Sequence, residues 1–254
     1  MSKVIAMAGK GGVGKTTVSA LVARHFAKNS KNPLLAVDAD PNSNLGETLG
    51  LEIEKTVGDI REDFMKDPQG VPSGMDKVLY LEMLMNQVLI EQQAFDLLVM
   101  GRQEGQGCYC MVNNILNRFS DELEKNYAYL LVDNEAGMEH LSRRTSGKVD
   151  ILVMVSDYAL RGLRAVGRIN SMLDDLKLEV RNKGLVVNRA PETLSPRFLE
   201  EVEKIGVPIL CTIPDDNNLL EFDMEQRSLL DLPDDSDAVK AVDGMMARVK
   251  EMIG

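Results

Sequence analysis

The opening of the chain constrains its fold more than any other stretch. Lys3 to Gly9, KVIAMAG, is an apolar run of strand type, and Thr16 to Asn29, TTVSALVARHFAKN, has a helical pattern. Between them lies GKGGVGKTT, which satisfies G-x-x-x-x-G-K-[ST]. In this strand–loop–helix context the motif binds phosphate, because bare backbone N–H groups and a helix N-terminus face the anion. The segment from Lys3 to Asn29 therefore predicts a nucleotide-phosphate site on an α/β fold.

Each residue of this loop has an expected task. Lys15 should reach the β- and γ-phosphates, Thr16 should ligate Mg²⁺, and Thr17 should touch the α-phosphate. Backbone N–H groups that can approach phosphate oxygens come from Gly11, Gly12, Val13 and Gly14. The predicted ligands are therefore ATP or ADP with Mg²⁺.

Seven apolar runs recur along the chain, with helical patterns between them. Near-continuous apolar runs are typical of strands covered by helices on both faces, and their alternation with helices indicates a parallel sheet with right-handed crossovers. The runs cover 3–9, 33–40, 95–101, 127–137, 150–157, 183–190 and 207–214. We predict one α/β P-loop NTPase domain over residues 1–254, with a mostly parallel, seven- to eight-stranded sheet flanked by helices on both faces. Residues 47–74 are expected to be a loop-rich insertion.

Composition argues against several classes of protein. The 29 basic and 40 acidic residues give a formal net charge of −11, which disfavours nucleic-acid binding. Three cysteines are too few for a disulfide framework and fit a reducing cytoplasm. We see no signal peptide and no apolar run of membrane-spanning length. The C-terminal spacing of Ala238, Val242, Met245, Val249 and Met252 predicts a helix face packed on the sheet, so no membrane partner is expected.

Lys10 makes the phosphate loop more specific. The pattern K-G-G-x-G-K-[ST]-T resembles the deviant phosphate loop of the division-site, chromosome-partitioning and nitrogenase iron-protein ATPases. The resemblance implies a nucleotide-sandwich homodimer in which Lys10 reaches the phosphates of the partner subunit. Such a lysine is chemically similar to an arginine finger supplied in trans, which accelerates hydrolysis by several powers of ten in better-known NTPases. A lone surface lysine is the alternative.

Carboxylates at two further strand ends match the same superfamily. VDADPNSN brings Asp38 and Asp40 beside the phosphate loop, because functional loops gather at the carboxyl ends of parallel strands. The resemblance to the first switch makes Asp40 the candidate that orients or activates the attacking water, with Asn44 as a matching polar position. LLVDNEAG looks like a Walker B strand that runs into the second switch. Asp133 would then hold Mg²⁺ through water, and the Gly137 N–H would sense the γ-phosphate. Simple capping of strand ends is the alternative.

Two late segments resemble the adenine-binding segments of the superfamily. In VVNRAP, the Asn188 amide would read the base edge and Arg189 would pack nearby. In TIPDDNN, the backbone around Pro214 would complete the pocket. Asn and Pro also terminate strands routinely, which is the simpler interpretation.

The pair Cys108 and Cys110 is the remaining distinctive feature. A C-x-C pair in an extended loop points both thiolates to similar sides, which suits one soft metal ion such as nickel or zinc. Thiolate sites for these metals usually contain four ligands, and a face-to-face homodimer would supply four sulfurs around its axis. Two incidental thiols or a redox dithiol are the alternatives. Cys211 lies in an apolar run and is expected to be buried.

Together, AGKGGVGKTT, VDADPNSNL and MGRQEGQGCYCMVNNILNRF resemble the CooC-type nickel-insertion ATPases, which mature carbon monoxide dehydrogenase. The resemblance implies a Mg·ATP-dependent homodimer that holds Ni²⁺ between the paired cysteines and delivers it to apo carbon monoxide dehydrogenase or apo acetyl-CoA synthase. One rival is an iron-protein-like reductase with an interfacial [4Fe–4S] cluster, but that family takes its cysteines from two separate loops. A spatial-positioning ATPase that binds membrane or DNA is the other.

Overall fold

Eight strands form one sheet in the order β3-β4-β2-β5-β1-β6-β7-β8. The computed structural model describes residues 2–67, 70–102, 122–135, 148–173 and 178–254. The strands are β1 (Lys3–Gly9), β2 (Leu34–Asp38), β3 (Leu89–Glu91), β4 (Phe95–Val99), β5 (Tyr129–Asp133), β6 (Lys148–Asp157), β7 (Glu179–Ala190) and β8 (Ile209–Pro214). All neighbours pair in parallel except β3, which runs antiparallel to β4 at one edge.

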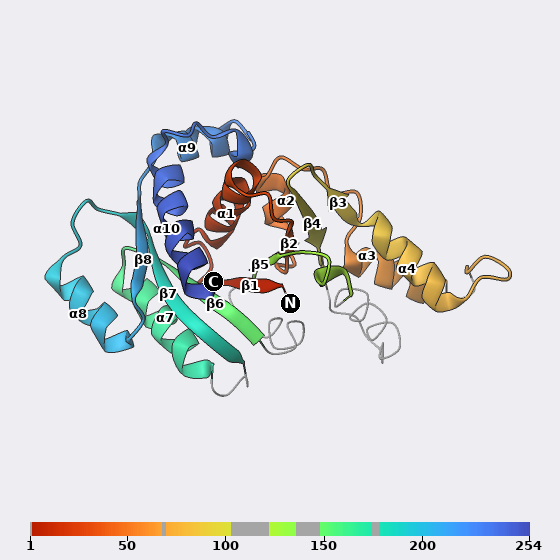
Figure 1. Ribbon diagram of the computed structural model, residues 1–254, viewed down its shortest axis with the longest axis horizontal. Coiled ribbons are helices and arrows are strands. Elements are labelled where there is room, and N and C mark those ends of the chain that lie inside the picture. Colours follow the sequence, from red (N-terminus) through yellow and green to blue (C-terminus); the bar gives the residue numbers. More distant parts are fainter. Residues whose placement is uncertain (1, 68–69, 103–121, 136–147, 174–177) are drawn as a thin grey trace.

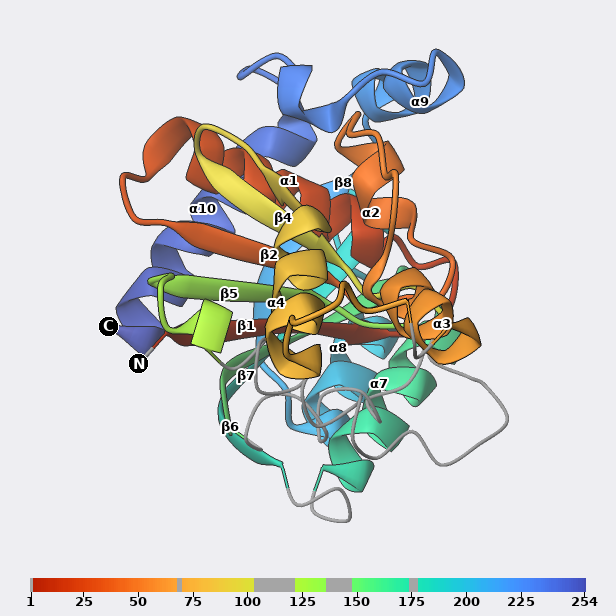
Figure 2. The ribbon, with the colours of Figure 1, turned by 90° about the vertical axis from the view of Figure 1, so that its right-hand side faces the viewer.

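Helices cover both faces of this sheet (Figures 1 and 2). On one face lie α1 (Lys15–Asn29), α2 (Asn44–Thr48), α9 (Asn217–Met224), the short helix η1 (Leu229–Asp231) and α10 (Asp237–Ile253). On the other lie α3 (Val57–Lys66), α4 (Lys77–Gln87), α7 (Leu160–Met172) and α8 (Pro196–Ile205). The fold is thus a single α/β domain with a three-layer arrangement.

The strand residues alternate between the two layers of core. In β1, Ile5 and Met7 pack under α1 and α10, whereas Ala6 and Ala8 pack under α7 and α8. Both sets are buried, because each face of the sheet is covered. This explains why the strands are apolar at nearly every position rather than at every second one.

The predicted sheet is confirmed. Each of the seven apolar runs contains a strand, and β3 is the eighth. The C-terminal packing face is confirmed for Ala238, Val242, Met245 and Val249, which are buried, but wrong for Met252, which is exposed while Ile253 is buried. Within the described part of the chain, no helix has the length and apolar character needed to cross a bilayer.

The predicted loop-rich insertion over residues 47–74 is wrong in one respect. It contains α3, a ten-residue helix. Thr56 caps it, because its side chain accepts the N–H of Asp59 while the Asp59 side chain accepts the N–H of Thr56 at 2.8 Å. These two reciprocal hydrogen bonds stabilise the start of the helix, although the surrounding sequence is rich in turn-forming residues.

Candidate functional site

The phosphate loop joins β1 to α1 in a conformation that requires glycine. Gly12 and Gly14 have φ values of 79° and 93°, in the left-handed region that residues with a Cβ rarely adopt. A Cβ on Gly14 would also lie 2.2 Å from Asn188 Nδ2. No described side chain caps α1, and its first turn has no acidic residue. Its first N–H groups and its positive dipole end therefore remain available to an anion.

The two lysines of the loop lie in different environments. Lys15 is buried, and its Nζ donates to the carbonyl oxygen of Lys10 across 3.4 Å. This is a long hydrogen bond that phosphate oxygens can replace. The Lys10 side chain is exposed. An exposed ammonium is free to contact a second subunit, as the resemblance implies, and that role stays a prediction.

Two buried carboxylates lie side by side next to the loop. Asp38 ends β2 and Asp133 ends β5, and the two residues pair directly in the sheet. They are 0% and 1% exposed. Asp38 accepts the N–H groups of Leu45 at 2.8 Å and Asp40 at 3.0 Å. Burial, with a contribution from the negative charge of Asp133, raises the pKa of Asp38 to about 7. Burial also raises the pKa of Asp133.

A magnesium ion fits the oxygen atoms around Asp133. Its Oδ1 accepts the Ser19 hydroxyl at 2.9 Å, and the Thr16 hydroxyl is close enough to oppose the rise in its pKa that burial causes. Its Oδ2 is buried and has no hydrogen-bond partner among the described residues. Mg²⁺ is bound by carboxylate, hydroxyl and water oxygens, so Thr16 directly and Asp133 through water would hold it. The cation would also compensate the charge of the buried carboxylates.

Asp40 lies at the same edge of the sheet. Its Oδ1 accepts the backbone and side-chain N–H groups of Asn42, both at 2.9 Å. Its charge raises the pKa of both Asp38 and Asp133, so it is close to the magnesium site. Ser43, with a φ of 56°, then turns the chain into α2, which begins at the exposed Asn44. The role of Asp40 toward water stays a prediction.

Asn188 and Arg189 fasten the end of β7 to the phosphate loop. Asn188 Nδ2 donates to the Val13 carbonyl at 2.9 Å, and Arg189 Nη2 donates to the Gly12 carbonyl at 2.6 Å. Asn188 Oδ1 accepts the Arg189 N–H at 3.0 Å. The amide of Asn188 keeps one N–H and one oxygen lone pair for another partner. This leaves capacity for the predicted contact with a base edge.

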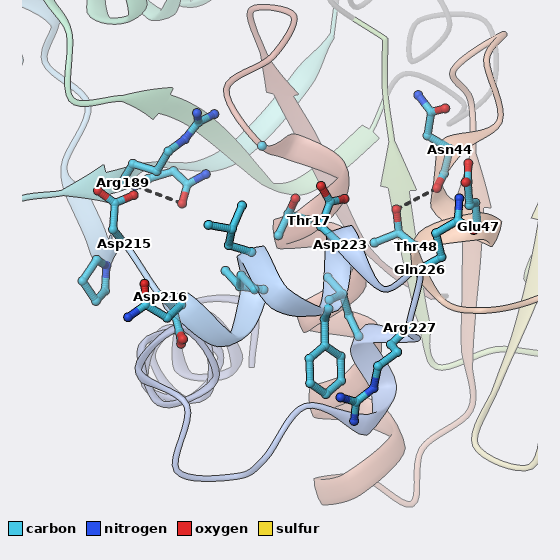
Figure 3. Close-up of a pocket in the computed structure, with 18 residues that line it drawn as sticks. Thr17, Asn44, Glu47, Thr48, Arg189, Asp215, Asp216, Asp223, Gln226 and Arg227 are labelled. Carbon is cyan, nitrogen blue, oxygen red and sulfur yellow. Dashed lines mark hydrogen bonds between the residues drawn. The ribbon is translucent and has the colours of Figure 1, made fainter.

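One cavity of about 840 Å³ lies beside the phosphate loop. Six of the predicted site residues line it: Gly14, Thr17, Asn44, Asn188, Arg189 and Pro214. Figure 3 shows Asp215 toward one end of this cavity, Thr48 toward the other, and Thr17 between them. Sequence positions separated by about 200 residues therefore meet at one ligand-sized cavity.

Helix α9 forms a wall of this cavity that was not predicted from the sequence. Leu219, Leu220, Phe222 and Asp223 line it. Asp216 fixes the start of α9, since its Oδ1 accepts the Asn218 N–H at 2.9 Å and its Oδ2 accepts the Ser236 hydroxyl at 2.6 Å. The segment TIPDDNN pointed to this region, but nothing in the sequence shows which face of the following helix is turned toward the loop.

Three predicted site residues lie outside the described residues: Cys108, Cys110 and Gly137. Their predicted roles therefore stay predictions. Within the described ranges, no three His, Cys, Asp or Glu side chains gather as a metal site. Cys211 of β8, expected to be buried, is only partly buried, and the burial that it has raises the pKa of its thiol to about 12.

Residues 4–229 match the CobQ/CobB/MinD/ParA nucleotide binding domain. The chain belongs to this family. The matched range contains the phosphate loop, both buried carboxylates and the Asn188–Arg189 contact.

Several relatives resemble the chain over nearly its whole length. An uncharacterised ATP-binding protein of Methanocaldococcus jannaschii is 39% identical over 248 residues, 97% of this chain and 98% of that protein. The carbon monoxide dehydrogenase accessory protein CooC of Rhodospirillum rubrum is 28% identical over 266 aligned positions, 98% of this chain and 97% of that protein. The MinD cell division protein of Aquifex aeolicus has the same fold, with a TM-score of 0.72 at 24% identity over 98% of this chain and 97% of that one.

Proposed function

We propose that the chain is a homodimeric, Mg·ATP-dependent ATPase that delivers nickel to apo carbon monoxide dehydrogenase or apo acetyl-CoA synthase. The observation that carries the ATPase part is the convergence of Lys15, Asp40 and Asp133 at one sheet edge, beside a cavity of about 840 Å³. The nickel part is supported by the C-x-C pair and by the similarity to CooC along nearly the full length of both proteins.

The hydrolytic step uses the groups that the site assembles. Water attacks the γ-phosphorus, the bond to the bridging oxygen breaks, and ADP and phosphate form. Asp40 orients the water and receives its proton, while Lys15 and the N–H groups of α1 stabilise charge on the phosphates. Lys10 from a second copy adds positive charge from the opposite side. Magnesium, when bound by Thr16 and Asp133, supplies further charge stabilisation at the phosphate oxygens.

The cargo site requires two copies of the chain. Cys108 and Cys110 supply two thiolates, and two protomers together supply four, which accept zinc tetrahedrally or nickel in a planar arrangement. A shared site makes metal affinity depend on dimer closure. Because ATP favours closure in a nucleotide-sandwich dimer, hydrolysis would open the metal site and release the cargo.

Metal stoichiometry tests this function directly. Equilibrium binding of Ni²⁺ and Zn²⁺, with mass measurement in apo, ADP and ATP-analogue states, should give half a metal per protomer in the closed dimer. Cys108→Ala and Cys110→Ala should lose the metal and keep nucleotide affinity, whereas Cys211→Ala is the matched thiol control. Unchanged nickel stoichiometry in Cys108→Ala would refute the proposal that this cysteine pair binds the nickel.

A spatial-positioning ATPase is the second candidate, favoured by similarity to proteins described as putative septum site-determining MinD, such as that of Nephroselmis olivacea at 26% identity. Sedimentation with anionic vesicles in the ATP-analogue state separates the two. Vesicle-bound protein without thiolate-bound metal would favour positioning. A brown, iron-containing dimer would instead favour the iron-protein-like reductase.

A further inference from the structure

Helix α7 lies in a basic stretch of this acidic chain. Residues 148–190 carry eight basic and five acidic side chains, whereas the whole chain carries 29 and 40. Within this region, α7 has three arginines and no acidic residue. This positive charge lies on a helix that the nucleotide chemistry does not use.

The three arginines of α7 lie on one face of the helix. Arg161, Arg164 and Arg168 are exposed and spaced at i, i+3 and i+7. Met172, which is 50% exposed, continues this face at i+11. The opposite face is buried against the sheet, through Gly162, Leu163, Ala165 and Val166. We call Arg161, Arg164, Arg168 and Met172 the arginine row. It extends for about 16 Å along the helix.

The neighbouring helix α8 forms no ion pair with the arginine row in the part of the chain that the structure describes. α7 and α8 lie side by side on the sheet face away from α1 and α10 (Figure 1). Lys204, and to a smaller extent Arg164, lowers the pKa of Glu201 on α8. The Glu201 carboxylate pairs with Lys204 Nζ at 2.6 Å, not with Arg164. Among the described residues, no carboxylate forms an ion pair with an arginine of the row. Leu199 of α8 is 44% exposed in the same layer.

We propose that the arginine row docks an acidic surface of a partner protein. Arginine and methionine are enriched in protein interfaces, and charge complementarity selects an acidic partner. The exposed Met172 and Leu199 give such an interface apolar contacts that a phosphate backbone does not use. Nucleic acid is the weaker fit for that reason alone, since the net charge of −11 opposes both kinds of polyanion. The proposal does not depend on nickel or on the nature of the client.

The arginine row begins at the nucleotide edge of the sheet. A Cβ on Gly162 would lie 2.3 Å from both Ser156 Oγ and Asp157 Oδ1, so α7 starts tightly against the end of β6. A Cβ on Gly9 would lie 2.4 Å from the Val155 carbonyl oxygen, so β6 also packs tightly against the start of the phosphate loop. A partner on the row therefore binds to an element that is in close contact with the ATP site.

Binding of defined polyanions to the full chain tests the proposal. The probes are a labelled 20-residue poly-L-glutamate peptide and a duplex DNA of equal total charge, followed by fluorescence anisotropy at low salt. Arg161→Glu/Arg164→Glu/Arg168→Glu should weaken peptide binding by at least about tenfold. A matched triple variant at the exposed Lys31, Lys66 and Lys77, also changed to Glu, should weaken it by less than about threefold, because it alters the net charge equally at other places.

The remaining outcomes overturn the proposal. Equal loss in both triple variants would show long-range electrostatics without a docking site. Tighter binding of DNA than of peptide, abolished by the row variant, would assign the row to nucleic acid. Loss of the ATP-analogue dimer in the row variant, measured by mass, would assign it to self-association, and no peptide binding at low salt would remove it as a site. If the triple Glu variant fails to bind ATP, each measurement is repeated with the triple Arg→Gln variant.

Discussion

Replacing Asp133 by Asn should make the nucleotide-free protein more stable at alkaline pH while abolishing its response to Mg·ATP. Asp38 and Asp133 are buried side by side, and Asp133 Oδ2 has no hydrogen-bond partner in the described part of the chain. Without a cation, two negative charges there oppose folding. The Asn side chain keeps an oxygen for the Ser19 hydroxyl and removes one of the charges.

The pH range of the effect follows from the pKa of Asp38, which rises from 3.8 to about 7 on folding, mainly through its own burial and less through the charge of Asp133. The repulsion between the two charges sets the size of the gain. Between these values the folded state binds more protons than the unfolded state, so stability is highest below the unfolded pKa and is lost as the pH rises through the folded pKa. Between pH 5 and pH 8 the loss from this group is about 3 kcal/mol. Two charges about 5 Å apart at an effective dielectric constant of about 20 also repel by about 3 kcal/mol. We therefore expect Asp133→Asn to gain about 2–3 kcal/mol at pH 8 and little at pH 5.

Urea unfolding at both pH values, without nucleotide or Mg²⁺, measures this gain. Asp150→Asn is the matched control, because Asp150 is also buried but bonds to Arg181 Nη1 and to the Val4 N–H, both at 2.9 Å. Loss of that paired charge should destabilise the protein by about 1–3 kcal/mol at pH 8. A lower urea midpoint for Asp133→Asn than for wild type at pH 8 would refute the reasoning.

Three further predictions concern the phosphate loop and the first switch. Lys15→Ala should abolish ATP binding in calorimetry, by at least about 100-fold in affinity, because it removes the buried cation of the loop; wild-type affinity would contradict this. Asp40→Ala should retain ATP but lower turnover by about 10²-fold or more and accumulate the ATP-bound dimer in mass measurements, and undiminished phosphate release would exclude its role in water activation. Gly14→Ala should weaken nucleotide binding and lower the melting temperature, since its Cβ would lie 2.2 Å from Asn188 Nδ2. Combining it with Asn188→Ala removes this clash and should restore part of the lost melting temperature.

Much of the fold could be predicted because its determinants are local. Each central strand is apolar at nearly every position, and the phosphate loop has its whole motif within nine residues. The carboxylates of Asp38 and Asp133 were predicted together because parallel strands end at one edge of a sheet. The sequence could not show that one of these oxygens is buried without a partner, since that depends on packing.

Three features were not predicted from the sequence: β3, α3 and the contact of Ser19 with Asp133. β3 has three residues and exists only through its antiparallel pairing with β4. The capping box of α3 lies within a stretch of turn-forming residues, which outweigh it in a sequence pattern. Ser19, which bonds to Asp133, lies one helical turn after Thr16, and that i+3 spacing could have revealed it.

The central position of β1 has a consequence for synthesis of the protein. β1 leaves the ribosome well before its sheet neighbours β5 and β6, with Lys3 opposite Tyr129 and Ile5 opposite Ile151. The strand that carries the phosphate loop must therefore wait for more than half of the chain before it can pair. Contacts this distant in sequence slow folding and leave apolar segments exposed during translation. ATP should consequently protect a nascent chain from proteolysis only late and abruptly, once the segments through α9 have emerged to complete the cavity, rather than gradually as helices accumulate.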